Sequence, residues 1–246
     1  MLIQACPNGP RRPGDHPALP VSPAAVARDA AAVVAVGARE LHVHPKDDAG
    51  ADSLHPAHVA EVVTAVRAAV PGVPIGVTTG AWALPDPGER VEVIRRWTVL
   101  PDHASLNWHE DGADDVAAAL LDRGVQIEAG LWHLEGVAAW QASPHRDSCL
   151  RVLLELPDGL DGAAAEAEAA RLLAAVGKGR PVLLHGEGSS CWPVLRSAVR
   201  RGLDTRIGLE DVLSLPDGAP APDNAALVTA ATAIVAAVRA VDGAGG

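Results

Sequence analysis

Short apolar stretches alternate with longer amphipathic ones along the whole chain, and this alternation limits the folds available to it. Eight short stretches are predicted to be β-strands: Leu2 to Cys6, Glu40 to His44, Pro74 to Thr78, Ala104 to Trp108, Val125 to Gly130, Arg151 to Leu156, Pro181 to His185 and Thr205 to Leu209. Eight longer stretches are predicted to be α-helices: Pro23 to Val36, Pro56 to Val70, Gly88 to Trp97, Ala113 to Arg123, Leu134 to Gln141, Ala163 to Val176, Ser190 to Arg201 and Asp223 to Ala240. Strict βα alternation in 246 residues predicts an α/β fold, a single (β/α)8 TIM barrel.

Start and stop signals support these helices. Ser22 and Pro23 form an N-cap followed by proline at the first helical position. Glycines suited to a left-handed helix end follow five of the helices: Gly37, Gly72, Gly124, Gly177 and Gly202. An open doubly wound sheet is the alternative, but no G-x-G-x-x-G sequence follows the first strand. Because no linker-like segment divides the chain, we expect one domain over residues 1–246.

Composition excludes several classes of partner. The net charge of -11 argues against nucleic acid or an anionic membrane, which require basic surfaces. No apolar run approaches the length of a membrane span, and the first residues lack the layout of a signal peptide. The three cysteines, Cys6, Cys149 and Cys191, are odd in number and widely spaced, which does not suggest a disulfide framework. We therefore expect a cytoplasmic protein.

The pair His42 and His44 ends the second predicted strand. Side chains alternate between the two faces of a strand, so both imidazoles point the same way. Two imidazoles on one face can chelate a divalent ion, and we interpret the pair as a metal site that needs a third ligand from elsewhere. The alternative is a pair of buried histidines with hydrogen-bond partners in the core.

The eighth predicted strand leads into Arg206-Ile207-Gly208-Leu209-Glu210-Asp211. Alternation puts Arg206 and Glu210 on one face, and in a closed barrel this strand lies beside the first and near the second. Glu210 can then complete a site with His42 and His44, leaving positions open for substrate. The alternative is an ordinary acidic pair that caps the following helix.

Polar residues gather where the predicted strands end. In a (β/α)8 barrel the active site lies at the carboxyl ends of the strands. Residues able to take part in chemistry occupy these ends: His42, His44, Thr78, Thr79, Ser105, Asn107, Glu128, Glu155, His185, Glu187, Arg206, Glu210 and Asp211. The opposite ends carry mostly Gly, Pro and Arg, so this asymmetry predicts an active site at one mouth of the barrel.

Several segments together resemble the β-keto acid cleavage enzyme family over nearly the whole chain. They are Asn8-Gly9-Pro10, Asp15 to Pro23, Gly37 to His44, Thr78-Thr79-Gly80, Ser105-Leu106-Asn107, Arg206 to Asp211, Pro216-Asp217-Gly218 and Asn224 to Val228. The resemblance implies a (β/α)8 barrel, a divalent metal, most consistent with Zn2+, and condensation of a β-keto acid with acetyl-CoA to give acetoacetate and a new acyl-CoA. It also implies a homo-oligomer, a dimer or tetramer.

The resemblance assigns roles by position. His42, His44 and Glu210 match the metal ligands, Asp211 the general base, and Arg206 the group that stabilises the developing oxyanion. Hydroxyl groups against the substrate carboxylate and thioester match Thr78 and Ser105, and we expect Asn107 and Glu128 to complete the substrate site.

Departures from the family pattern bear on the substrate. In members that act on 3-keto-5-aminohexanoate, two glutamates hold the ammonium group, and Pro10 and Gly130 occupy their places here. We therefore expect a neutral or anionic β-keto acid. Two other functions compete with this interpretation: a metal-dependent hydrolase on the same barrel, and a barrel that binds a metal or ligand without catalysis.

Overall fold

Eight strands and eight α-helices alternate in the computed structural model, which describes residues 1–244. The strands are β1 (Ile3–Ala5), β2 (Glu40–Val43), β3 (Ile75–Thr78), β4 (His103–Asn107), β5 (Gln126–Leu131), β6 (Arg151–Leu156), β7 (Val182–Gly186) and β8 (Thr205–Ile207). The helices are α1 (Pro23–Ala35), α2 (Pro56–Ala69), α3 (Pro87–Arg95), α4 (Ala113–Asp122), α5 (Leu134–Ala142), α6 (Gly162–Val176), α7 (Cys191–Arg201) and α8 (Asn224–Ala244). Two single-turn 3-10 helices are η1 (Arg146–Ser148) and η2 (Gly188–Ser190). Each predicted strand and helix is confirmed, with ends shifted by a few residues; residues 245–246 of the expected single domain lie outside the described part.

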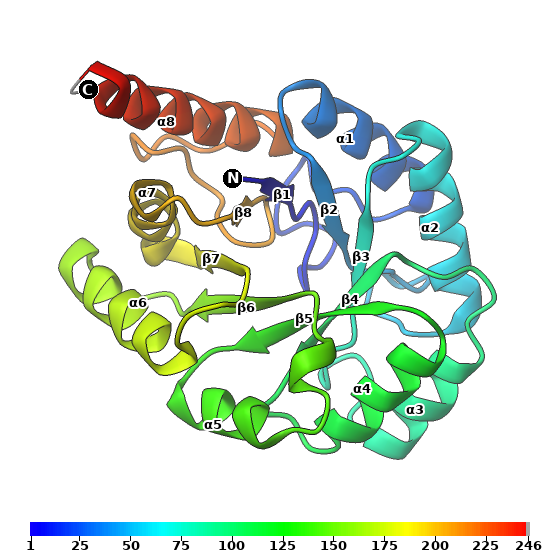
Figure 1. The fold of residues 1–246 in the computed structure, drawn as a ribbon. Coiled ribbons are helices and arrows are strands. Elements are labelled where there is room, and N and C mark those ends of the chain that lie inside the picture. The colour runs from blue at the N-terminus through cyan, green and yellow to red at the C-terminus, as the bar shows by residue number, and fades with distance from the viewer. Residues whose placement is uncertain (245–246) are drawn as a thin grey trace.

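The strands form one parallel sheet that curls into a barrel (Figure 1). Its order is β7-β6-β5-β4-β3-β2-β1-β8, so β1 lies between β2 and β8. The barrel closes between β7 and β8 through a parallel bridge from Leu183 to Asp204, where the Leu184 amide donates to the Asp204 carbonyl over 2.9 Å. The structure is therefore a (β/α)8 barrel, and its helices surround the sheet.

The hydrophobic core lies between the strands and the ring of helices. On β2, Leu41 and Val43 are fully buried in this core, while the alternate residues face the inside of the barrel. Helix starts and ends follow the predicted signals: the Ser22 hydroxyl accepts a hydrogen bond from the Ala25 amide. Gly202 has a φ of +68° and ends α7 in the left-handed conformation.

The half of the barrel interior that lies away from the carboxyl ends of the strands, here called the lower half, is filled by polar side chains. In most barrels of this fold, branched apolar side chains fill the interior. A lower network of buried side chains joins five strands and consists of Gln4, Glu40, His103, Glu128 and Arg151. Arg151 donates to Glu128 over 2.7 Å and also contacts Glu40, and Nε2 of His103 lies 3.2 Å from Glu40. This network fills the barrel beneath the mouth.

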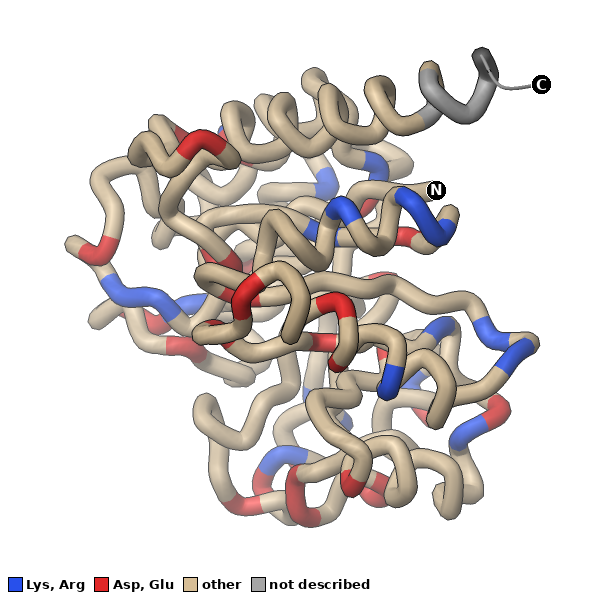
Figure 2. The backbone as a smooth tube through the Cα atoms, turned by 90° about the vertical axis from the view of Figure 1, so that its left-hand side faces the viewer, with Lys and Arg blue, Asp and Glu red and all other residues tan. Residues whose placement is uncertain are grey.

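Charged residues are spread over the molecule. In Figure 2, acidic and basic positions are interspersed along the visible face, and no single basic surface dominates that view. Among residues 1–244, no helix is both long enough and apolar enough to cross a membrane.

The contact between β1 and β8 generates a stability prediction. A Cβ atom at Gly208 would overlap the carbonyl oxygen of Cys6, which accepts a hydrogen bond from the Glu210 amide over 3.2 Å. Because backbone cannot move aside as a side chain can, we expect Gly208→Ala to lower the free energy of unfolding by about 3 kcal/mol. Urea unfolding followed by circular dichroism measures this.

Gly162→Ala is the matched control, because a Cβ there meets no described atom within 4 Å. It should be neutral or stabilise the protein by about 0.5 kcal/mol. Equal unfolding midpoints for the two variants would contradict the tight β1–β8 contact.

Candidate active site

A cavity of about 350 Å³ opens at the carboxyl ends of the strands. Its position is the one that the fold predicts for an active site. Twelve residues line it: Pro10, His42, His44, Thr78, Trp82, Ser105, Asn107, Trp132, Glu155, Glu187, Arg206 and Glu210. Most of them belong to the polar set at the strand ends that the sequence singled out.

Three of the lining residues form a group able to hold a metal ion. One potential ligand atom from each of His42, His44 and Glu210 lies within 4.8 Å of the others. Nε2 of His44 is 3.3 Å from Oε1 of Glu210. Nδ1 of His42 and Oε2 of Glu210 are buried without a hydrogen-bond partner among the described residues. Two imidazoles and a carboxylate are a donor set that Zn2+ accepts, so these residues fit a divalent ion with a position left for substrate.

The backbone around this group brings β1, β2 and β8 together. The Asn8 side chain donates to the His44 carbonyl over 2.9 Å and accepts from the His44 amide over 3.0 Å, which fixes the end of β2. Gly9, with a φ of +54°, passes against the Glu210 side chain, where a Cβ would overlap the Glu210 methylene groups. Glu210 can approach the histidines because residue 9 has no side chain.

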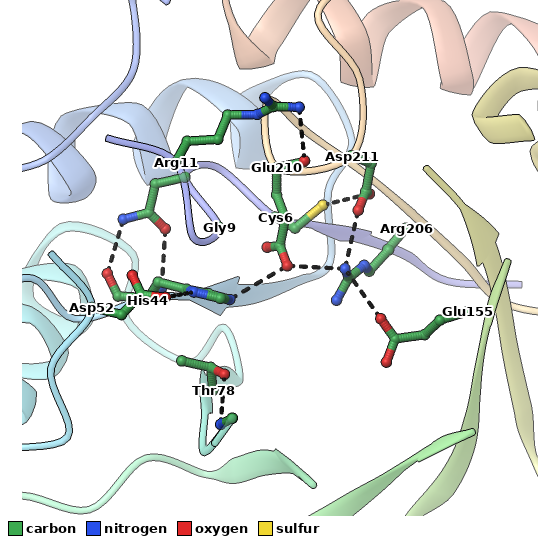
Figure 3. Close-up of polar contacts among 12 residues, drawn as sticks. Cys6, Gly9, Arg11, His44, Asp52, Thr78, Glu155, Arg206, Glu210 and Asp211 are labelled. Carbon is green, nitrogen blue, oxygen red and sulfur yellow. Dashed lines mark hydrogen bonds and ion pairs between the residues drawn. The ribbon is translucent and has the colours of Figure 1, made fainter. Parts of the chain in front are cut away.

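Asp52 orients His44 from the loop after β2 (Figure 3). Its carboxylate lies 2.8 Å from Nδ1 of His44, which leaves Nε2 directed toward Glu210. The same carboxylate pairs with Lys46 over 2.5 Å and accepts from the Trp82 indole over 2.8 Å. A carboxylate behind a metal-binding imidazole fixes its tautomer and raises its basicity. The sequence carries no signal for Asp52, because its place depends on the path of a loop.

The protonation states of the group suit metal binding. Burial lowers the pKa of His42 to about 4, so its imidazole is neutral. Burial also acts to lower the pKa of His44, but Glu210 and Asp52 outweigh it and raise this pKa to about 9. Burial opposes ionisation of Glu210, yet Arg206 and His44 hold its pKa well below the usual range. The carboxylate and the neutral His42 are ready ligands, and a cation would replace the His44 proton.

The Arg206 guanidinium lies beside the metal group and faces the cavity (Figure 3). Its Nη2 atom is 3.0 Å from Glu210, 3.0 Å from Asp211 and 3.7 Å from Glu155. Burial lowers the pKa of Arg206, but Asp211 and Glu210 outweigh it and raise the pKa further above its usual value. The Arg206 guanidinium is therefore always charged, and it lies where it would contact a negatively charged group of a molecule bound in the cavity.

Asp211 lies behind Arg206, outside the cavity lining. Its carboxylate is fully buried: Oδ2 accepts from the Cys6 thiol over 2.8 Å and Oδ1 accepts from Arg206 over 3.0 Å. His185 approaches the same Oδ1 atom at 3.5 Å. Burial opposes ionisation of Asp211, but Arg206 and His185 lower its pKa. The residue expected to be the base is therefore close to the site but has no direct contact with the cavity.

Three of the four residues expected to bind substrate line the cavity, namely Thr78, Ser105 and Asn107. Glu128 does not: its side chain is fully buried in the lower network and accepts from Arg151. The residue of β5 that pairs with Asn107, at cavity level, is Gly130. Glu128 is two residues earlier on the same strand, about 7 Å further from the mouth. Its expected contact with substrate is not supported by this position.

Two further carboxylates, Glu155 and Glu187, reach the cavity. A Cβ at Gly130 would overlap the Asn107 side chain and lie 3.1 Å from Oε1 of Glu155, so these two side chains use the space that glycine leaves. Burial and the nearby Asp211 raise the pKa of Glu187 to about 7. The sequence placed both glutamates at strand ends, but only the barrel geometry shows that they share a wall of the cavity.

The fold and the site together define the protein as a (β/α)8 barrel with a candidate metal centre and a buried arginine at its mouth. A family model described as "beta-keto acid cleavage enzyme" matches residues 1–241. The chain belongs to the β-keto acid cleavage enzyme family, which confirms the resemblance seen in its sequence segments.

Solved structures of low sequence identity share the fold. The apo structure of ObcA has a TM-score of 0.65 at 17% identity over 93% of this chain and 63% of ObcA. The chain thus spans less than two thirds of the length of ObcA. The 3-dehydroquinate dehydratase of Geobacillus kaustophilus has a TM-score of 0.61 at 14% identity, over 97% of this chain and 91% of that enzyme. At these identities the likeness extends to the fold alone.

The metal group generates the next prediction. Purified protein loaded with Zn2+ should hold one ion per chain, and His42→Ala should lose it because a direct ligand is removed. Asp52→Asn should weaken Zn2+ affinity by about 10- to 100-fold, because His44 loses the carboxylate that orients it. Elemental analysis and competition with a chelating dye measure both effects.

His145→Ala removes an imidazole at the N-terminal end of η1, outside the cavity lining, and serves as the control. Its zinc content should equal that of the wild type. Unchanged zinc in His42→Ala would show that the ion binds elsewhere.

Proposed function

We propose that this protein is a metal-dependent enzyme that condenses a β-keto acid with acetyl-CoA, giving acetoacetate and a new acyl-CoA. Membership of the β-keto acid cleavage enzyme family supports the reaction class. The observation that carries the proposal is the juxtaposition of the His42, His44 and Glu210 group with the buried Arg206 cation in one cavity. Zn2+ as the ion, acetyl-CoA as co-substrate and a homo-oligomeric assembly are parts of the proposal that rest on the family.

The ligand group determines where the acid would bind. A divalent ion held by His42, His44 and Glu210 would act as a Lewis acid that polarises the keto group and acidifies the carbon between it and the carboxylate. The protein would orient the acid with hydroxyl and amide groups at the ends of β3 and β4, the strands that follow β2 in the sheet. Oγ1 of Thr78 accepts from the Gly80 amide over 3.1 Å, so its proton is free for a substrate oxygen.

Asn107 is held rigidly at the end of β4. Its amide donates to Glu110 over 2.9 Å and its carbonyl accepts from the Trp132 indole over 3.2 Å. Both tryptophans of the lining, Trp82 and Trp132, are thus tied by their indole nitrogens to polar groups of the site. Fixed walls of this kind hold two reactants in one orientation.

Arg206 would stabilise negative charge at two stages. Loss of a proton from the acidified carbon gives an enolate, which attacks the acetyl-CoA thioester through a first tetrahedral oxyanion and releases the CoA thiolate. The thiolate then adds to the original keto carbon through a second oxyanion, and breakage of the carbon–carbon bond releases acyl-CoA and the acetoacetate enolate. Return of the stored proton completes acetoacetate. A permanent, buried guanidinium suits both oxyanions.

Asp211 is the proposed general base. Its carboxylate is kept ionised by Arg206 and His185, but it lies behind Arg206 and not at the cavity surface.

Loss of either charged residue should slow turnover with little effect on folding. We expect Arg206→Gln and Asp211→Asn each to lower kcat by on the order of 10² or more. Acetoacetate formation from a β-keto acid should require acetyl-CoA in the wild type, measured by a coupled assay. A hydrolase would act without acetyl-CoA and a binding barrel would not turn over, so either result would refute the proposal.

The charge of the cavity wall predicts the substrate class, which we propose to be a neutral or anionic β-keto acid. Pro10 lines the cavity and Gly130 pairs with the cavity residue Asn107, and neither Pro10 nor Gly130 has a side chain that can pair with an ammonium group. A desolvated cation without a partner costs several kcal/mol. In a panel of β-keto acids assayed with acetyl-CoA, neutral and anionic members should therefore have the highest kcat/KM. A best substrate with an amino substituent would contradict this.

A further inference from the structure

The side-chain amide of Asn107 is held so that it can only donate to a molecule in the cavity. Asn107 lines the cavity at the end of β4 and is only 5% exposed. Its nitrogen donates to Glu110, and its oxygen accepts from the Trp132 indole. An indole nitrogen donates and cannot accept, so Trp132 selects the oxygen end of the amide. The second N–H of Asn107 has no partner among the described residues and remains for a ligand.

Glu110 selects the other end of this amide and joins the loops after two neighbouring strands. It lies in the turn after β4, and its side chain is 7% exposed. Its Oε1 atom accepts from Asn107 over 2.9 Å, whereas Oε2 accepts from the Ala81 amide over 2.9 Å and from the Arg90 guanidinium. Ala81 belongs to the loop after β3 and precedes the cavity residue Trp82. One carboxylate therefore fixes both loops and the orientation of Asn107.

Arg90 holds Glu110 from the ring of helices. It lies on α3, is fully buried and does not belong to the cavity lining. Its guanidinium pairs with Glu110 and donates to the carbonyl groups of Asp111 over 2.7 Å and Thr79 over 3.4 Å. All three acceptors lie in the loops that follow β3 and β4. Because a guanidinium is planar and its donors have fixed directions, Arg90 determines the position of the carboxylate as well as balancing its charge.

Stability alone does not explain why this ion pair is buried. Removing two charges from water costs about as much as their attraction returns, and apolar groups of the same volume often replace such a pair without loss of stability. The Nε atom of Arg90 is itself buried without a partner among the described residues. What the pair provides to the site is a charged acceptor against one N–H of Asn107, which leaves the other N–H for the cavity.

We propose that Glu110 and Arg90 are positioning residues that make Asn107 a hydrogen-bond donor to the β-keto acid. This inference rests on the proposed function and deepens it, because it states how the acid is recognised. Asn107 then donates to an oxygen of the bound acid. The Thr78 hydroxyl, at the end of the neighbouring strand, offers a second donor. Two donors suit the oxygen atoms of a carboxylate or keto group.

Binding of acetoacetate tests this inference without knowledge of the natural substrate. Acetoacetate is the product of the proposed reaction and is itself a β-keto acid, so the zinc-loaded protein should bind it, as measured by calorimetry. Asn107→Ala should weaken this binding by about tenfold or more, because a hydrogen bond to a charged group is lost. Glu110→Gln should weaken it by a similar factor. Glutamine keeps the shape of the side chain, but it has one acceptor oxygen for three donors, so Asn107 cannot keep both of its contacts.

The double variant separates an effect through Asn107 from independent damage. If Glu110 acts through Asn107, Glu110→Gln should weaken acetoacetate binding no further in the Asn107→Ala background. A merely structural role of Glu110 would instead lower the affinity by the same factor in both backgrounds. Multiplied losses in the double variant would therefore overturn the inference.

Two substitutions test Arg90. Arg90→Met leaves the Glu110 carboxylate without its cation, so acetoacetate affinity should fall by about tenfold at unchanged zinc content. Arg90→Lys should recover part of the affinity, since an ammonium group can still pair with the carboxylate. In turnover of the best β-keto acid of the panel, both variants should raise KM for the acid and leave KM for acetyl-CoA within about twofold. Wild-type affinity in Arg90→Met would contradict the role of Arg90.

Arg67→Met is the matched control. Arg67 lies on α2 and donates to the Leu100 carbonyl over 3.1 Å and to Asp102 over 3.0 Å, so it also ties a helix to a loop. Within residues 1–244, neither partner is hydrogen-bonded to a cavity-lining residue. Its loss should change acetoacetate affinity by less than about twofold. Equal losses in Arg67→Met and Arg90→Met would show that general loosening of the helices explains the effect.

The outcomes distinguish the two proposals. Absence of acetoacetate binding by the zinc-loaded wild-type protein would refute the proposed function and this inference with it. Binding by the wild type together with unchanged affinity in Glu110→Gln, at equal zinc content, would overturn this inference while the proposed function stands.

Discussion

The ion pairs of one guanidinium organise the mouth of the barrel. Arg206 is almost fully buried and contacts carboxylates of three residues, Glu155, Glu210 and Asp211. Burying this many charges is costly unless each has a partner of opposite sign. Without the arginine, three carboxylates would repel one another in a region of low dielectric constant. Arg206 contributes most to the lowered pKa values of Glu210 and Asp211, with smaller contributions from His44 and His185.

The barrel interior has two polar tiers with different partners. In the upper tier, Nδ1 of His42 and Oε2 of Glu210 have no hydrogen-bond partner among the described residues, and an ion or a substrate can satisfy them. In the lower network, Glu40, His103 and Glu128 also have the composition of a metal group. There, however, the Arg151 guanidinium already contacts both carboxylates. The Arg151 guanidinium thus pairs with both carboxylates of the lower network, whereas in the upper tier Oε2 of Glu210 has no partner among the described residues and can bind a metal cation.

The sequence predicted the strand face on which each site residue lies more accurately than the residue's level along the barrel axis. Local patterns, chiefly apolar periodicity and the glycines at helix ends, were enough to predict the eight strands and the eight α-helices. Alternation also placed His42, His44 and Glu210 together once the barrel was assumed. Glu128 was placed on the correct inner face but at the wrong level, since the register between β5 and β6 is not written in either strand alone. Asp52 lies in a loop whose path depends on Lys46 and Trp82, so no spacing rule could find it.

The metal group is drawn from opposite ends of the chain, since β1 lies between β2 and β8. His42 and His44 come early in the sequence, whereas Glu210 and the arginine that stabilises it come after seven βα units. A nascent chain on the ribosome therefore exposes two imidazoles long before their carboxylate partner has been synthesised. The complete ligand set forms only when β8 docks beside β1 and the barrel closes. Binding of the proposed ion by all three ligands would therefore be a late event in folding.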